Sequence, residues 1–165
     1  MKPLTTISLT AGLLFVFCGD SLAQSASIKR QCRDFAAREY PKDAGMQGYI
    51  YEQQINAYRY LRTVKDSEVK SIALREYPSD FSMQKYIYNK QLSAKEFMST
   101  VRDREVKSIA LREYPSDFSM QKYIYNKQLS AKEFMRSISS SAKKRRAQRN
   151  YPEDYAMQRY EYSRL

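Results

Sequence analysis

Several residue types on which enzyme chemistry depends are absent or scarce in this chain. It contains no histidine and no tryptophan, and only two cysteines and four glycines. Without histidine, the chain lacks an ordinary general base near neutral pH and the commonest metal ligand. It has no Cys–His pair and no glycine-rich phosphate loop. The sequence therefore predicts a protein that is not an enzyme, with no catalytic residues, no metal site and no cofactor.

Long apolar runs are also scarce. The one that occurs, Leu9 to Cys18, is too short for a transmembrane helix, which needs about 20 apolar residues. It follows a basic N-terminus and precedes small residues at the positions that signal peptidase recognises, Ser21 and Ala23. We therefore expect residues 1–23 to be a signal peptide, and the remainder to be secreted or periplasmic without a transmembrane anchor.

Cleavage would leave a single cysteine, Cys32, and hence no internal disulfide framework. Cys32 aligns with Val69 and Val106 of the repeats described below, which favours a small buried side chain. The alternative is an intermolecular disulfide that joins two chains, because an odd cysteine in an exported protein is available for such pairing.

Positive charge is plentiful: 29 Lys and Arg against 18 Asp and Glu give a formal net charge of +11. This balance favours acidic partners. For an exported chain, proteins and envelope polymers are favoured over nucleic acid. The densest run consists of Lys143, Lys144, Arg145 and Arg146, which is either a docking site for an acidic partner or a solvated end of the fold.

The chain is organised around one motif that occurs four times. The copies begin at Tyr40, Tyr77, Tyr114 and Tyr151 and share the pattern Tyr-Pro-x-Asp-x-x-Met-Gln-x-Tyr-x-Tyr, with their prolines 37 residues apart. A fixed period of this length is typical of repeat proteins, in which neighbouring units bury one another's apolar faces. We expect a single repeat domain over 24–165, with repeats of about 28–63, 64–100, 101–137 and 138–165.

Each repeat predicts two helices. Val106, Ile109 and Ala110 have helical spacing, and this first helix, about 101–113, must end before the proline. The second helix is predicted to run through Ser93 and to break near Ser99 and Thr100, where the apolar stripe changes phase. The aspartate two residues after each proline is the expected N-cap of the second helix: Asp43, Asp80, Asp117 and Asp154.

The predicted fold class is therefore all-α, with tandem helical hairpins stacked as a short α-solenoid or a helical bundle. The last copy differs from the others, because Arg146 and Glu161 stand where the third copy has Ile109 and Ile124. Its second helix is also shorter. Polar residues on the outward face of a terminal repeat are typical of a capping repeat.

The motif resembles one found in small exported bacterial proteins of unknown function, in which an aromatic residue, Asp, Met and Tyr recur at similar spacing. Cysteines often occupy there the places held here by Cys32 and Ile50. The resemblance implies export and a helical hairpin, and it implies no activity. It also implies that aliphatic packing has replaced a disulfide in this chain.

Two faces of the second helix carry tyrosines. Tyr51, Tyr88, Tyr125 and Tyr162 are candidate binding residues, because tyrosine gives a large contact area at low entropic cost; the alternative is a structural role. The Met–Tyr pairs such as Met83 and Tyr86 are predicted to be core, and the alternative is a ligand-binding aromatic row. The glutamine of each motif, for example Gln84, is interpreted as a solvated position or a contact for an extended partner.

The sequence thus predicts an exported interaction module that binds an acidic macromolecule, with a protein favoured, through a basic, tyrosine-rich face. The alternative is a cationic binder of anionic envelope polymer or of a membrane surface. The identity of the partner and the oligomeric state are not encoded in these patterns.

Overall fold

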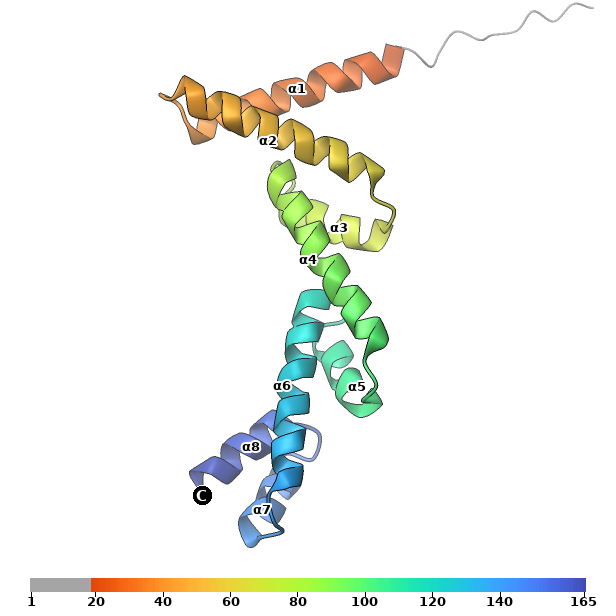
Figure 1. The fold of residues 1–165 in the computed structure, drawn as a ribbon, viewed down its shortest axis with the longest axis vertical. Helices are drawn as coiled ribbons and strands as arrows, with labels where there is room; N and C mark the ends of the chain where they lie inside the picture. The colour runs from red at the N-terminus through yellow and green to blue at the C-terminus, as the bar shows by residue number, and fades with distance from the viewer. Residues whose placement is uncertain (1–18) are drawn as a thin grey trace, which may run out of the picture. The chain divides into compact units, whose positions relative to one another are not determined.

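A computed structural model describes residues 19–165 (Figure 1). Residues 1–18, which hold most of the expected signal peptide, lie outside the described residues. The described part of the chain is all-α, as predicted, with no strand. Its helices are α1 (Gly19–Glu39), α2 (Ala44–Thr63), α3 (Ser67–Glu76), α4 (Phe81–Thr100), α5 (Arg104–Glu113), α6 (Phe118–Ser137), α7 (Ala142–Asn150) and α8 (Tyr155–Arg164). Within residues 19–165, none of these helices has the length and apolar character needed to cross a membrane.

The chain divides into two compact units, Met1–Ile55 and Asn56–Leu165, and the boundary falls within α2. In the first unit, α1 and the beginning of α2 are joined by a turn, and Cys32, Ala36 and Ile55 are buried. Helix α1 begins earlier than predicted. The first repeat was expected to start near residue 28, but residues 24–27 are helical and continuous with the rest of α1.

The second unit contains three hairpins, α3–α4, α5–α6 and α7–α8, in which the two helices of each pair pack together (Figure 1). Helix α4 also packs against α6, and α6 against α8. One core cluster shows the consequence, because Met98 of α4 is buried with Val106 and Ile109 of α5 and with Ile124 of α6. A long helix therefore serves two hairpins, its own and the next one along the chain.

The ends of the long helices agree with the sequence pattern. Helix α4 runs through Ser93 and ends at Thr100, as predicted. The Asp80 side chain accepts a hydrogen bond from the backbone N–H of Met83 at 3.0 Å, and the other three motif aspartates do the same for the residue three positions on. These bonds satisfy N–H groups that have no partner inside the helix.

The starts of the short helices depend on caps that the sequence reasoning missed. Helix α5 was expected to begin near Val101, but it begins at Arg104 because Asp103 accepts a hydrogen bond from the N–H of Val106 at 3.0 Å. Asp66 and Ser141 cap α3 and α7 in the same way. The helix break of three residues between α4 and α5 is thus fixed by a side chain.

The motif glutamines are structural, which corrects their interpretation as solvated or partner-binding positions. Gln84 is only 1% exposed, and its Nε2 donates a hydrogen bond to the carbonyl oxygen of Tyr77 at 2.6 Å. Gln47, Gln121 and Gln158 make the equivalent bond to Tyr40, Tyr114 and Tyr151. Each bond ties the C-terminal end of one helix to the first turn of the next helix.

Candidate binding surface

The structure corrects the choice of two of the four candidate binding tyrosines, Tyr88 and Tyr125. Tyr88 and Tyr125 are only 3% and 4% exposed, and Tyr51 and Tyr162 are half-buried. The Tyr125 ring packs edge-on against Phe97 of the preceding long helix, with centroids 5.9 Å apart. Tyr88 likewise packs edge-on against Tyr60 of the preceding long helix. The face of the long helix that carries Tyr88 or Tyr125 is therefore buried against that preceding helix and is closed to a partner.

The exposed tyrosines lie two residues earlier in each motif. Tyr49, Tyr86 and Tyr123 are each 58% exposed, and Tyr160 is 53% exposed. These are the tyrosines that were predicted to pack in the core with the motif methionines. Met83 and Met120 are half-buried, whereas the tyrosine three residues on points to solvent. The surface-facing aromatic row of this chain is therefore the one at Tyr86 and its equivalents.

In the second unit, a basic residue lies four positions after each exposed tyrosine. The pairs are Tyr86 with Lys90, Tyr123 with Lys127, and Tyr160 with Arg164, and all six residues are exposed. Residues four apart share one face of a helix. In the last pair, Arg164 donates a hydrogen bond to the Tyr160 hydroxyl at 2.9 Å. We call these three sets the tyrosine–cation pairs.

A second basic residue precedes each of these tyrosines and is held against a ring of the preceding long helix. The Lys122 ammonium lies 4.9 Å from the ring centroid of Phe97, and Arg159 lies 4.9 Å from that of Phe134. Lys85 lies over Tyr60 in the same way, at 5.0 Å. Tyr86, Tyr123 and Tyr160 are thus each flanked by two positive charges, one of which is held against a ring of the preceding long helix, and this setting suits an acidic ligand.

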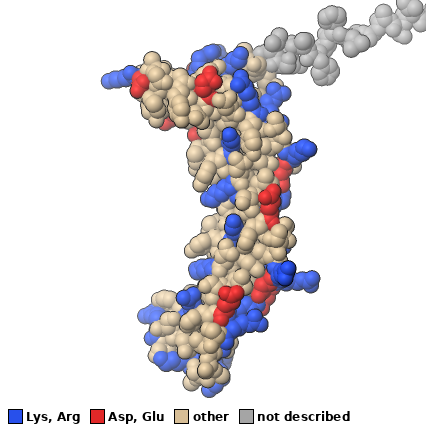
Figure 2. Space-filling model, viewed as in Figure 1, with Lys and Arg blue, Asp and Glu red and all other residues tan. Residues whose placement is uncertain are grey.

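The basic run on α7 does not present four free charges. Lys144 donates to the carbonyl oxygen of Ile138 at 2.9 Å, and Arg146 pairs with Glu161 at 3.3 Å. Lys143 and Arg145 are exposed. Figure 2 shows that on the face drawn, Lys and Arg of the second unit are spread over many positions rather than gathered in one patch. The run is thus one part of a dispersed positive surface.

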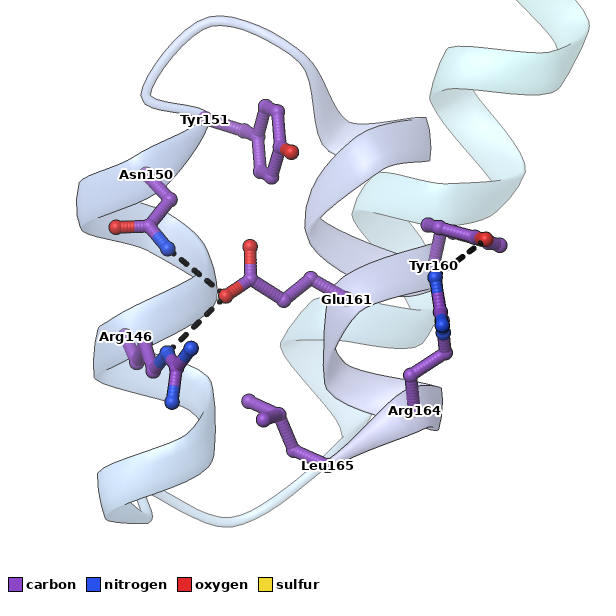
Figure 3. A pocket seen from close by; sticks show the side chains of 7 residues that line it. All are labelled: Arg146, Asn150, Tyr151, Tyr160, Glu161, Arg164 and Leu165. Carbon is purple, nitrogen blue, oxygen red and sulfur yellow. Dashed lines mark hydrogen bonds and ion pairs between the residues drawn. The ribbon is translucent and has the colours of Figure 1, made fainter.

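The last hairpin contains a pocket of ≈ 420 Å³ between α7 and α8 (Figure 3). Glu161 points into the space between the two helices, where its carboxylate accepts a hydrogen bond from Asn150 at 2.8 Å and pairs with Arg146. The hairpin before it has two buried isoleucines at the corresponding positions, Ile109 and Ile124. The carboxylate is therefore a polar replacement for an apolar contact, already engaged by two donors.

One charged cluster has strongly perturbed groups. Lys132 of α6 contacts Asp103 at 2.8 Å and Glu105 at 2.7 Å, and the Tyr155 hydroxyl donates to Glu105 at 2.6 Å. Burial opposes the charge on Lys132, but its hydrogen bonds to the two carboxylates outweigh burial and raise its pKa above the ordinary range. The cluster joins α5, α6 and α8, so its role is to hold hairpins together.

The remaining candidates are the buried cysteine and the acidic side chains of residues 19–165. Cys32 is 1% exposed, and burial raises the pKa of its thiol, which fits the interpretation as a small buried side chain. Within residues 19–165, no group of three or more acidic, cysteine or histidine side chains is placed to hold a metal ion.

Comparison with known proteins adds no relative: no family model, no curated protein and no solved structure matches this chain. The function is therefore inferred from the surface chemistry of the chain itself. The tyrosine–cation pairs are the surface feature that recurs most regularly, and a signal for them was present in the sequence. A basic residue both before and four after the same tyrosine is typical of a solvated position rather than of a core position.

Proposed function

We propose that this chain is an exported, non-enzymatic interaction module that binds an acidic segment of a partner protein through the tyrosine–cation pairs. The observation that carries the proposal is the recurrence of an exposed tyrosine with a basic residue four positions on, in α4, α6 and α8. Tyrosine contributes rigid, amphipathic contact area, and the neighbouring cations favour carboxylates. Export is proposed from the N-terminal sequence pattern.

The packing of the helices supports a surface with several equivalent contacts. Helices α4 and α6 pack together, as do α6 and α8, and each carries its pair near the same distance from its own capping aspartate. Because the tyrosine–cation pairs lie on helices, their backbone is preorganised, which lowers the entropic cost of binding. A partner with acidic residues at several points would gain from engaging more than one pair.

A cationic binder of anionic envelope polymer or membrane is the second candidate, and the net charge of +11 favours it. The two candidate functions differ in how much of the binding energy comes from tyrosine. Binding by charge alone depends on Lys and Arg and falls steeply with salt, whereas a protein contact draws much of its energy from aromatic anchors. Selective loss of the tyrosines therefore separates the two classes.

The test uses a short polyglutamate peptide with tyrosine spacers and, in parallel, phosphatidylglycerol vesicles. One variant replaces Tyr86, Tyr123 and Tyr160 by serine, and a second replaces Lys90, Lys127 and Arg164 by glutamine. We expect the serine variant to bind the peptide about tenfold more weakly or worse, as loss of aromatic anchors does. The glutamine variant should bind more weakly and show a smaller dependence on salt.

A matched control replaces the exposed leucines Leu74 and Leu111, which are 43% and 41% exposed and lie outside the pairs, by serine. This control should bind the peptide like the unmodified chain. If the tyrosine variant bound the peptide at full strength while the glutamine variant lost the vesicles, the protein-binding proposal would be wrong and the polymer or membrane candidate would replace it.

A further inference from the structure

In the second unit, the second half of a long helix docks into the next hairpin through a glutamine. The Gln91 side chain donates from Nε2 to the capping carboxylate of Asp117 at 2.9 Å, and its Oε1 accepts from the backbone N–H of Ser119 at 3.0 Å. Gln91 is 3% exposed. A buried amide that satisfies both a cap and a first-turn N–H is a specific contact rather than a general apolar one.

Two further residues of the same helix complete the contact. Six positions after Gln91, Phe97 meets the ring of Tyr125, and one position later Met98 is 3% exposed in the core of the α5–α6 hairpin. Aromatic pairs in this edge-on arrangement add to the energy of burial. The docked helix therefore carries three contacts: glutamine, an aromatic residue six positions on, and a bulky apolar residue seven positions on.

The next junction repeats the three contacts. Gln128 donates to Asp154 at 2.9 Å and accepts from the N–H of Ala156 at 3.0 Å. Phe134 meets the ring of Tyr162 at 6.0 Å, and Met135 is 2% exposed. Because two junctions use the same residues at the same spacing, the receiving half of the contact is defined by a capping aspartate, a first-turn N–H and a tyrosine.

The first unit has this receiving half as well. Asp43, Gly45 and Tyr51 stand at the positions of Asp117, Ser119 and Tyr125. Within residues 19–165, the Asp43 side chain accepts only the N–H of Met46, and both Asp43 and Gly45 are exposed. A groove of ≈ 450 Å³ lies beside them between α1 and α2, lined by Ala37, Ala44, Gln47, Gly48 and Tyr51, among others.

The groove is open at its centre. Gly48 has no atom within 4 Å of the position where a Cβ would lie. In the later hairpins this position holds Lys85 or Lys122, each of which covers an aromatic ring of the docked helix. The first unit thus combines an exposed capping carboxylate that holds only its capping bond, a half-buried tyrosine, and a groove beside them.

We propose that the groove between α1 and α2 docks an amphipathic helix of a partner protein. This partner helix carries a glutamine, an aromatic residue six positions after the glutamine, and Met or Leu seven positions after it. The occupant belongs to another protein because Gln91 and Gln128 of this chain are already bonded to Asp117 and Asp154. This site is separate from the tyrosine–cation pairs, so the two proposals stand or fall independently.

The probe is a peptide with the sequence of residues 89–102, NKQLSAKEFMSTVR, which is the part of α4 that docks into the α5–α6 hairpin. It carries a fluorophore and is titrated with the full chain while anisotropy is recorded. We expect saturable binding. A peptide with Gln91→Ala and Phe97→Ala should bind at least about tenfold more weakly, since it loses the amide contact and the ring.

Two variants at one position test the groove itself. Gly48→Ala and Gly48→Phe both remove a helix-weakening glycine, so neither should lower the melting temperature. Gly48→Ala leaves the groove open and should bind the peptide as the unmodified chain does. Gly48→Phe fills the groove and should abolish binding.

Two results would overturn the proposal. One is the absence of saturable binding to the unmodified chain. The other is equal binding by Gly48→Phe, which would mean that the peptide displaces a long helix within the second unit. Light scattering of the chain alone provides a third measurement. If the unmodified chain forms dimers and the Gly48→Phe variant does not, the occupant is a second copy of this chain, which would contradict assignment to a partner protein.

Discussion

The side-chain amide of Gln84 donates to the backbone carbonyl oxygen of Tyr77, seven residues earlier, across the turn that contains Pro78. Gln84 is among the largest fully buried side chains, and Tyr77 is half-buried. The carbonyl belongs to the end of α3 and the amide to the first turn of α4. The Tyr77 carbonyl also accepts a hydrogen bond from the backbone N–H of Asp80 at 3.4 Å, so two hydrogen bonds hold the turn between the helices.

Gln84→Ala is expected to destabilise the chain by about 1 kcal/mol, because it removes the side-chain hydrogen bond to the Tyr77 carbonyl oxygen and leaves only the longer bond from the Asp80 N–H. The measurement is the free energy of unfolding in urea. Lys90→Ala, at an exposed position on the same helix, serves as the control and is expected to change stability by less than about 0.5 kcal/mol. Equal effects of the two substitutions would contradict the structural role of Gln84.

Asp117 caps α6 and also receives Gln91 from α4, whereas Asp43 has the capping bond alone. Asp43→Ala is expected to cost about 1 kcal/mol, the usual value for an N-cap. Asp117→Ala should cost about 1 kcal/mol more, since the Gln91 amide also loses its partner. Asp117→Asn keeps an oxygen acceptor and should retain most of the stability in thermal unfolding. Indistinguishable losses at Asp117 and Asp43 would rule out the second bond as a stabilising contact.

The Lys132 cluster predicts a loss of stability in acid. Burial alone would raise the pKa of Asp103, but hydrogen bonds from Lys132 and the Val106 N–H lower it overall. The Glu105 pKa is lowered chiefly by hydrogen bonds from Lys132 and Tyr155. Folded pKa values below the unfolded ones mean that this stabilisation is present above the ordinary values of 3.8 and 4.5 and is lost as pH falls through the folded values.

Lys132→Met is therefore expected to flatten the acid limb of a plot of stability against pH. The pKa of Lys132 is raised, so its own contribution is present below the ordinary value of 10.5 and is lost as pH rises through the folded value. Lys127→Met removes an exposed charge on the same helix and should leave the shape of the acid limb unchanged. An unaltered acid limb in Lys132→Met would show that the cluster does not govern it.

The Arg146–Glu161 pair is expected to be replaceable by apolar residues. Glu161→Ile alone removes an ionic partner from a mostly exposed arginine, and Arg146→Ile alone leaves a carboxylate whose side chain is only 14% exposed. The double variant restores the Ile109–Ile124 contact of the preceding hairpin and should be at least as stable as the unmodified chain. Chemical denaturation of the four forms gives the coupling energy. Simple addition of two losses would contradict the expected replacement.

The positions of the helices could be predicted from the sequence because apolar periodicity and capping involve residues that are close together in the chain. The long helix through Ser93 and its end at Thr100 follow from apolar periodicity, and the capping aspartates follow from their place after proline. Helix α5 begins three residues later than predicted, because the Asp103 side chain caps it, whereas the prediction was based on apolar spacing. Short-range chemistry thus defines the helices to within a few residues.

The faces of the long helices were not accessible in the same way. Tyr86 and Tyr88 are two positions apart and point in nearly opposite directions, and both occur in every repeat. Which one is buried depends on Tyr60 of the preceding long helix, against which the Tyr88 ring packs. Gln84 was misjudged for a related reason, since its partner is a backbone carbonyl that leaves no trace in a side-chain pattern.

The sharing of each long helix between two hairpins has a consequence for how such a chain changes length. Residues 69–98 and 106–135 are identical, so excising residues 81–117 would join Asp80 to Phe118 and recreate the junction that already exists between Asp80 and Phe81. The shortened chain would need no new contact surface between its hairpins. Unequal recombination between the identical gene segments can therefore remove or add whole hairpins, and each remaining junction between hairpins keeps contacts that already exist in the chain.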